Sequence, residues 1–209
     1  MISAREALDR LRNGNRRFVS RFANKGSKHN SYRRAVTAEG QNPFAIILGC
    51  SDSRVPTEIV FDQGLGDLFV IRVAGNIVAP SQIGSVEFAT SSFGTTLVVV
   101  LGHSQCGAVL AALNYAREQP AQEQSENSRS IVDRIRPAIE PLLSSENDTE
   151  ADALIECAIR ANVRASVDQL RHGSKILEKQ IDNEELQIIG AEYSLETGAV
   201  EYFYDPENA

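Results

Sequence analysis

Residues 44–56 read FAIILGCSDSRVP and residues 95–107 read TTLVVVLGHSQCG, and these two stretches decide the expected fold. Each begins with a short, nearly continuous apolar run, which is typical of a strand buried on both faces of a sheet. A third such run, residues 69–73 (FVIRV), lies between them, and residues 82–92 follow it with the pattern of a helix. Strands that alternate with helices indicate βαβ crossovers, so we predict an α/β fold with a parallel sheet.

The remainder of the chain extends this pattern without an internal repeat. Three more helices are predicted at residues 108–117, 131–143 and 152–171. Residues 118–130 are rich in Gln, Glu and Ser and are interpreted as a mobile connection. Residues 187–193 and 199–204 flank the turn sequence Glu196-Thr197-Gly198 and predict a hairpin. We therefore expect one domain over residues 1–209: a mostly parallel central sheet flanked by helices, with a long N-terminal helical arm and a C-terminal hairpin or edge strand.

Length and composition bound the class of protein. The chain has 209 residues, of which 42% are hydrophobic and 23% are charged, so it is long enough to bury a core and is not a disordered chain. No apolar run approaches ~18 residues, the length that a membrane-spanning helix needs. The N-terminal residues lack the apolar region of a secretory signal. We therefore expect a cytoplasmic protein that does not insert into a membrane.

Charge is distributed unevenly along the chain. Residues 1–34 carry ten basic and two acidic side chains, whereas residues 35–209 carry 11 basic and 26 acidic ones. The arginines of the first 18 residues alternate with apolar residues at helical spacing, and Ser3 with Glu6 forms the pattern of a capping box. We interpret this segment as an amphipathic arm that lies on an acidic body, its own or that of a neighbouring subunit. Nucleic-acid binding is the weaker alternative, and we expect no nucleic-acid partner.

The odd number of cysteines argues against a disulfide framework and leaves metal binding, catalysis or burial for each of them. Cys157 lies in a helical pattern (ALIECAIR) and is predicted to be a small buried hydrophobic residue. Cys50 directly follows one predicted strand, and His103 and Cys106 follow another. Because the carboxyl ends of parallel strands meet at one edge, these three residues make a Cys₂His set that suits zinc with an open fourth position. A buried Cys106 and a His103 bonded to a loop carbonyl would be the structural alternative.

Three neighbouring residues could complete a reactive centre. Asp52 and Arg54 lie two and four residues after Cys50, and an arginine can hold a carboxylate in a bidentate pair that keeps it ionised. Such a carboxylate could accept a hydrogen bond from metal-bound water or could itself occupy the fourth position. An Asp at a helix N-terminus would explain Asp52 but not Arg54. Gly107 lets the backbone approach closely where the next helix begins, which offers an amide donor to an anion.

The motifs CSDSRVP and GHSQCG, separated by 52 residues between Cys50 and His103, resemble those of the β-class carbonic anhydrases. FVIRVAGNIV (69–78) and IGSVEFA (83–89) extend the resemblance, which is strong over residues 40–110, the zinc-site core. It implies one zinc ion on Cys50, His103 and Cys106. It also implies reversible hydration of CO₂ to bicarbonate and a proton through a zinc-bound hydroxide, oriented by an Asp52–Arg54 dyad. The family's dimers are built by N-terminal helices, here residues 1–34, and tetramers also occur.

The resemblance also implies a substrate pocket. Gln41 matches a Gln that lines the CO₂ pocket across the dimer interface, and Phe69 and Ala74 match its apolar neighbours. Phe88 stands where the family has a Tyr, which removes a hydroxyl from the pocket. Ile47 stands where a second subgroup has a Trp for an inhibitory bicarbonate site, so we expect the subgroup whose site is always open. The Gly107 amide and the Gln41 side chain could hold the forming bicarbonate oxygens.

Other functions compete with this interpretation. The same scaffold could hydrolyse COS or CS₂, and access to the pocket would decide between these substrates and CO₂. A zinc-held structural protein or thiol redox sensor is a second alternative, although a structural site would supply a fourth Cys or His. A nucleotide site is weaker still, because Gly64-Leu65-Gly66 does not open a G-x-G-x-x-G turn.

Overall fold

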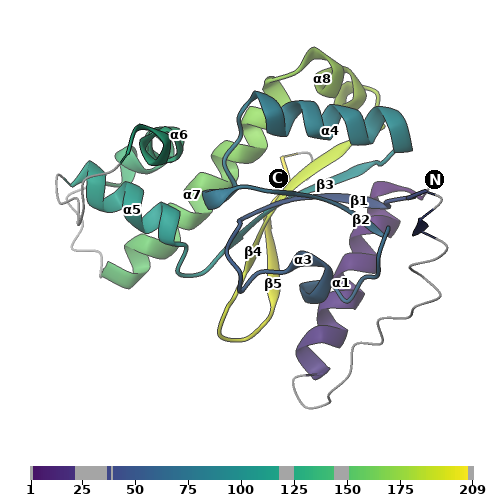
Figure 1. Ribbon diagram of the computed structural model, residues 1–209, viewed down its shortest axis with the longest axis horizontal. Helices are drawn as coiled ribbons and strands as arrows, with labels where there is room; N and C mark the ends of the chain where they lie inside the picture. Colours follow the sequence, from purple (N-terminus) through teal and green to yellow (C-terminus); the bar gives the residue numbers. More distant parts are fainter. Residues whose placement is uncertain (1, 22–36, 39, 118–124, 144–150, 207–209) are drawn as a thin grey trace.

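A computed structural model describes residues 2–21, 37–38, 40–117, 125–143 and 151–206. Its centre is a five-stranded sheet with the strand order β2-β1-β3-β4-β5 (Figure 1). The first four strands in this order are parallel, and β5 is antiparallel to β4. The strands are β1 Ala45–Gly49, β2 Leu68–Arg72, β3 Leu97–His103, β4 Gln187–Tyr193 and β5 Val200–Tyr204. The predicted mostly parallel sheet and C-terminal hairpin are thereby confirmed.

The central strands are apolar because both of their faces are covered. Every residue of β1 and β3 is buried. Alternate side chains enter two different layers: Ile47 and Val99 join the core on one face, and Ile46 and Val98 join the core on the other. Burial on both faces explains why the sequence shows continuous apolar runs in place of alternation.

Helices cover both faces and extend beyond the carboxyl edge of the sheet (Figure 1). One face carries α4 (Pro80–Phe93), α7 (Ala151–His172) and α8 (Lys175–Asp182), and the other carries α1 (Ala4–Arg21) and α3 (Thr57–Val60). At the carboxyl edge, α5 (Gly107–Ala116) and α6 (Glu126–Leu143) pack with α7 around a third apolar cluster, which includes Cys50 and Cys106. Of the described helices, none is long and apolar enough to cross a membrane.

Helix α7 packs directly against two strand positions that lack side chains. A Cβ atom added at Gly102 of β3 would lie 2.6 Å from Val163 Cγ2, and one added at Gly190 of β4 would lie 2.8 Å from Val163 Cγ1. Both distances are shorter than van der Waals contact, so only glycine allows this approach. The middle of α7 is therefore held at a fixed height above the sheet.

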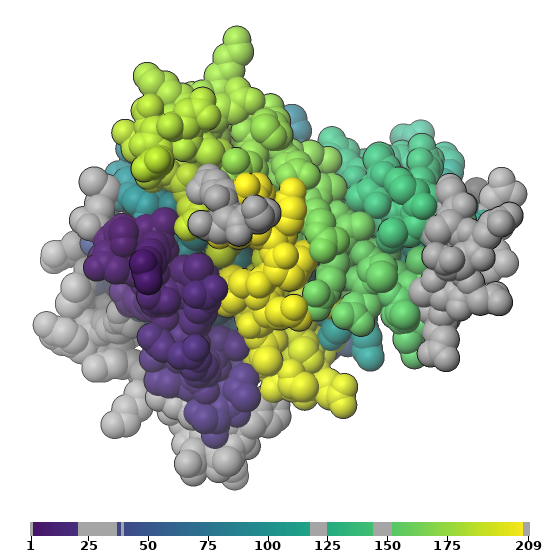
Figure 2. All heavy atoms as spheres, turned by 180° about the vertical axis from the view of Figure 1, so that it is seen from behind, coloured from purple at the N-terminus to yellow at the C-terminus, as the bar shows by residue number. Residues whose placement is uncertain are grey.

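The N-terminal helix begins and packs as the sequence predicts. The Glu6 carboxylate accepts the Ser3 backbone N–H at 2.8 Å, and the Ser3 hydroxyl accepts the Glu6 N–H at 3.2 Å, which is the capping box. Figure 2 shows α1 beside the C-terminal hairpin, where Asn15 donates to the Gly198 carbonyl oxygen at 2.9 Å. Arg10 forms an ion pair with Asp67 at 3.1 Å, so the arm lies on an acidic part of its own chain. Residues 22–34 of the predicted arm lie outside the described residues.

Some local predictions were wrong. The connection predicted over residues 118–130 extends too far, because α6 already begins at Glu126. The Ser125 hydroxyl accepts the Ser128 N–H at 3.3 Å at the start of this helix. Residues 118–124 lie outside the described residues. Helices α3 and α8 were not predicted, since both are short. Cys157 is exposed and not buried, because it lies off the buried stripe of α7 that contains Leu154, Ala158 and Asn162.

Candidate metal centre

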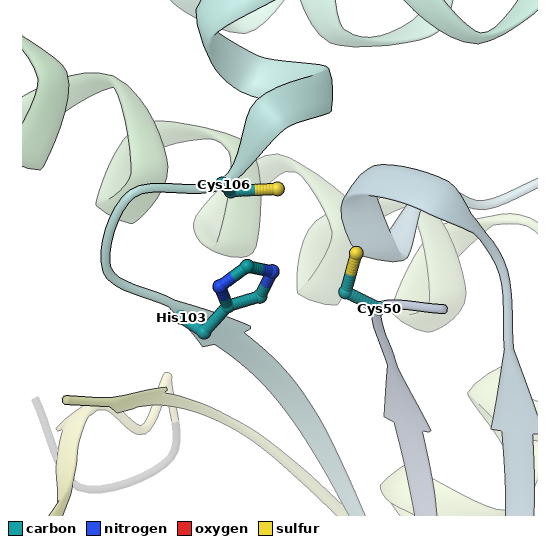
Figure 3. Close-up of side chains that lie close together, drawn as sticks. All are labelled: Cys50, His103 and Cys106. Carbon is teal, nitrogen blue, oxygen red and sulfur yellow. The ribbon is translucent and has the colours of Figure 1, made fainter. Parts of the chain in front are cut away.

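Three potential metal ligands meet at the carboxyl edge of the sheet. Cys50 follows β1, His103 is the last residue of β3, and Cys106 is the N-cap of α5. Because β1 and β3 are adjacent and parallel, with Gly49 opposite Leu101, their ends present these side chains to one point. The two sulfur atoms and one imidazole nitrogen lie within 4.8 Å of one another, and all three residues are buried (Figure 3).

The His103 ring is oriented so that one nitrogen is available to a metal. Its Nδ1 atom bonds the Ser104 carbonyl oxygen at 2.9 Å, which requires that Nδ1 carries the proton. Its Nε2 atom is buried and has no hydrogen-bond partner among the described residues. Both features of the structural alternative, a carbonyl-bonded His103 and a buried Cys106, are present. They nevertheless leave an unsatisfied nitrogen lone pair beside two thiols, which is costly unless a cation accepts it.

The donor set fits zinc. Tetrahedral zinc with sulfur at ~2.3 Å and nitrogen at ~2.0 Å holds its ligand atoms about 3.5–3.8 Å apart, which is compatible with the observed cluster. The neighbouring Cys106 thiol lowers the pKa of the Cys50 thiol, although burial opposes this. The Cys50 sulfur and burial raise the pKa of the Cys106 thiol. A cation between the sulfur atoms would favour ionisation of both.

The Cys50 sulfur also accepts a hydrogen bond from the backbone. The Gly75 N–H donates to Cys50 Sγ at 3.3 Å from the short 3₁₀ turn η1 (Ala74–Asn76). Gly75 has a φ of 68°, which glycine adopts without strain. This turn lies within FVIRVAGNIV, but Gly75 was not predicted to belong to the site. Its signal in the sequence was a glycine three residues after the end of β2.

Asp52 and Arg54 form the predicted bidentate pair at the edge of the cluster. Arg54 Nε donates to Asp52 Oδ1 at 2.9 Å, and Arg54 Nη2 donates to Asp52 Oδ2 at 2.7 Å. These bonds hold the pKa of the Asp52 carboxyl well below its usual range. Asp52 Oδ2 lies 3.9 Å from His103 Nε2, so an ionised carboxylate borders the position that a metal ion would occupy. Arg72 fixes this loop by donating to the Cys50 and Asp52 carbonyl oxygens at 3.0 and 2.6 Å.

The other predicted pocket residues divide into two groups. Ala74 is the first residue of η1 and Gly107 is the first residue of α5, so both lie beside the metal ligands. Gln41 is exposed and precedes β1, at the end of the sheet away from Cys50. Phe69 pairs in register with Ile46, four residues before Cys50, which is about 13 Å along the strand. Phe88 contacts Phe69 and is 55% exposed, so a single chain does not bring Gln41, Phe69 and Phe88 to the metal ligands.

Fold and site together define an α/β protein with a preformed position for one metal ion at the carboxyl edge of a parallel sheet. A family model described as carbonic anhydrase matches residues 45–200. The chain is 37% identical over 188 residues to carbonic anhydrase 2 of Mycobacterium tuberculosis, covering 90% of this chain and 87% of the relative. It is also 37% identical over 195 residues to the carbonic anhydrase of Mycolicibacterium smegmatis, covering 91% and 89%.

Comparison with solved structures indicates the same family as the sequence relatives. The β-carbonic anhydrase CafA of Aspergillus fumigatus superimposes with a TM-score of 0.75 at 25% identity, covering 90% of this chain and 89% of that chain. The β-carbonic anhydrase CcaA gives a TM-score of 0.71 at 26% identity, covering 95% and 89%. The chain belongs to the β-class carbonic anhydrases. It is an enzyme with carbonic anhydrase activity, as the two sequence motifs had predicted.

Proposed function

We propose that this enzyme hydrates CO₂ reversibly with one zinc ion per chain, held by Cys50, His103 and Cys106, and with Asp52 and Arg54 as a catalytic dyad. The observation that carries the proposal is the bidentate pair itself, whose Asp52 Oδ2 lies 3.9 Å from the unsatisfied His103 Nε2. When bound, zinc supplies a Lewis acid that ionises water to give the nucleophile for CO₂. The dyad would act on that nucleophile.

In this proposal Asp52 orients the attacking hydroxyl, and Arg54 holds the Asp52 carboxylate in place. Because Arg54 occupies both carboxylate oxygens and the pKa of Asp52 is far below its usual range, Asp52 is an acceptor at neutral pH. Accepting the hydrogen of the attacking hydroxyl would direct its lone pair at the carbon of CO₂. The pairing with Arg54 also opposes movement of Asp52 onto the metal, which favours the always-open subgroup.

The oxygens of the forming bicarbonate would be held by amides. Gly107 is exposed at the first position of α5, and no atom lies within 4 Å of the place where a Cβ would stand. An anion can therefore approach the N-terminus of this helix without a side chain in its way. Ala74 would form the small apolar wall beside it, and Gln41 would reach the bicarbonate only from another subunit.

The proposal therefore includes a homodimer joined through the N-terminal arm, in which Gln41, Phe69 and Phe88 of one subunit complete the pocket of the other. Two observations support it: these side chains lie away from Cys50 within one chain, and among the described residues β2 pairs with β1 alone, which leaves one edge of the sheet open. The Sordaria macrospora β-carbonic anhydrases, similar in fold, are tetrameric. A tetramer of two such dimers would be the larger form.

Changing Phe88 to Glu tests this arrangement. The variant should run as a smaller species in size-exclusion chromatography with light scattering, and its CO₂ hydration should fall with it, because a charge would enter an apolar contact. Ile176→Glu is the matched control, since Ile176 is 50% exposed on α8, and it should change neither mass nor activity. A monomeric Phe88→Glu protein with full activity would show that one chain holds the complete site.

Turnover should rise from pH 7 to pH 8.5 when CO₂ hydration is followed by stopped flow on protein of known zinc content. Two thiolates and a neutral imidazole cancel the charge of Zn²⁺, so the water should ionise at a pH above the ~7 of a site with three neutral imidazoles. Asp52 does not contribute to this rise, because its lowered pKa keeps it ionised at both values. Equal rates at the two pH values would show that the charge of the two thiolates does not suppress ionisation of the water. No turnover with one zinc per chain would favour COS or CS₂ as the substrate.

A further inference from the structure

The turn that donates to Cys50 is held in part by bonds from another element. Gly75 and Asn76 adopt positive φ angles of 68° and 43° in succession, a conformation that glycine and asparagine accept more readily than other residues. The Asn76 Nδ2 group is buried and finds no hydrogen-bond partner among the described residues, so it makes no bond that would fix the turn. Inside the turn the Asn76 N–H bonds the Val73 carbonyl oxygen at 3.0 Å, and the Gly75 and Asn76 carbonyl groups take their partners from elsewhere in the chain.

Helix α7 supplies these contacts. Asn162 Nδ2 donates to the Gly75 carbonyl oxygen at 2.8 Å, and Ser166 Oγ donates to the Asn76 carbonyl oxygen at 3.0 Å. The two donors are four residues apart, so they lie on the same face of the helix, and each is only 2% exposed. Water has little access to replace either donor, and the carbonyl groups would be left unsatisfied without them.

We propose that Asn162 and Ser166 are positioning residues for the metal centre, which hold the turn Ala74–Asn76 so that the Gly75 N–H points at Cys50 Sγ. This inference deepens the proposed zinc site and rests on it. An N–H bond to a thiolate both orients the sulfur and withdraws charge from it, so it sets how strongly Cys50 donates to the ion. Two side chains almost 90 residues after the turn thereby adjust a metal ligand that neither of them touches.

The alternative is that both bonds only stabilise the fold. Val167 provides a control for this possibility because it is fully buried on the same helix and packs on the sheet near Gly190, and its apolar side chain cannot donate a hydrogen bond to η1. Val167→Ala should lower the unfolding temperature in the way any loss of buried methyl groups does. It should leave the metal centre as it is.

The experiment compares Asn162→Ala, Ser166→Ala and Val167→Ala in the full-length protein. Zinc dissociation constants are measured by competition with a chelator, and the charge-transfer band from thiolate to metal is recorded after loading with cobalt(II). We expect the first two variants to bind zinc about 10-fold or more weakly and to shift the cobalt band, whereas Val167→Ala matches the wild type in both. Ser166→Ala removes a single oxygen atom and keeps the test open if Asn162→Ala does not fold.

Two outcomes separate this inference from the site on which it rests. If Ser166→Ala and every folded Asn162 variant match Val167→Ala in affinity and spectrum, the bonds are structural and the inference is overturned. If the wild-type protein itself binds neither zinc nor cobalt(II), the proposed metal site is wrong and not only its positioning.

Discussion

Replacing Asp52 by Asn should lower the turnover of CO₂ hydration by about 10²-fold or more while one zinc ion per chain stays bound. Asn has the size of Asp and can still accept one hydrogen bond from Arg54, so the loop should keep its course. It loses the negative charge that now lies 3.9 Å from His103 Nε2, and its amide can donate where the carboxylate only accepts. Stopped-flow rates and metal analysis on the same sample measure the effect.

Asp62→Asn provides the control for this change. Asp62 also pairs with an arginine, Arg17 of α1, but this pair joins α1 to the end of α3 and is not part of the cluster of potential metal ligands. Its φ of 48° is one that Asn tolerates, so the backbone should not move. Turnover in this variant should equal that of the wild type. If Asp52→Asn with full zinc content turned over at the wild-type rate, Asp52 would have no part in the mechanism.

The second large effect is expected from Cys106→Ala. The substitution removes one of three metal ligands and leaves the buried His103 nitrogen and the Cys50 sulfur with an incomplete set. Because three protein ligands are the minimum of a catalytic zinc site, zinc should be lost during dialysis against a weak chelator, and hydration activity should fall by about 10³-fold or more. Metal analysis before and after dialysis, with rates on both samples, tests this.

The chain provides its own control in its third cysteine. Cys157 is exposed on α7 and is not part of the cluster, so Cys157→Ala should keep zinc, activity and unfolding temperature. These two variants also distinguish a metal site from a redox sensor. If Cys157→Ala alone abolished the reaction with a thiol oxidant, that reaction would be a property of the surface cysteine. If Cys106→Ala retained its zinc, the proposed ligand set would be wrong.

The fold and the cluster of potential metal ligands could be predicted because their signals are local. An apolar strand, a ligand directly after it and a neighbouring strand with the same arrangement are enough to place Cys50, His103 and Cys106 at one edge. The Asp52–Arg54 pair could be predicted for the same reason. The two residues are two positions apart, so the contact between their side chains does not depend on the rest of the fold.

The contacts that could not be predicted are those between distant segments. Asn162 and Ser166 have no motif, and their partners lie 87 and 90 residues earlier in the chain. The exposure of Cys157 depends on the rotation of α7 about its axis, which packing decides and composition does not. Gln41 and Phe88 were assigned to the pocket by resemblance alone, and in the proposed dimer they would serve the site of a second chain.

The close approach of α7 to the sheet makes the active site depend on two positions that carry no chemistry. Gly102 and Gly190 determine the height of the helix, the helix carries Asn162 and Ser166, and these two bonds fix the turn beside Cys50. One added methyl group at Gly102 would raise the helix against Val163 and draw both donors away from the turn. In evolutionary terms, these glycines would be selected for the reactivity of a thiolate with which they have no contact. A survey restricted to active-site residues would overlook them.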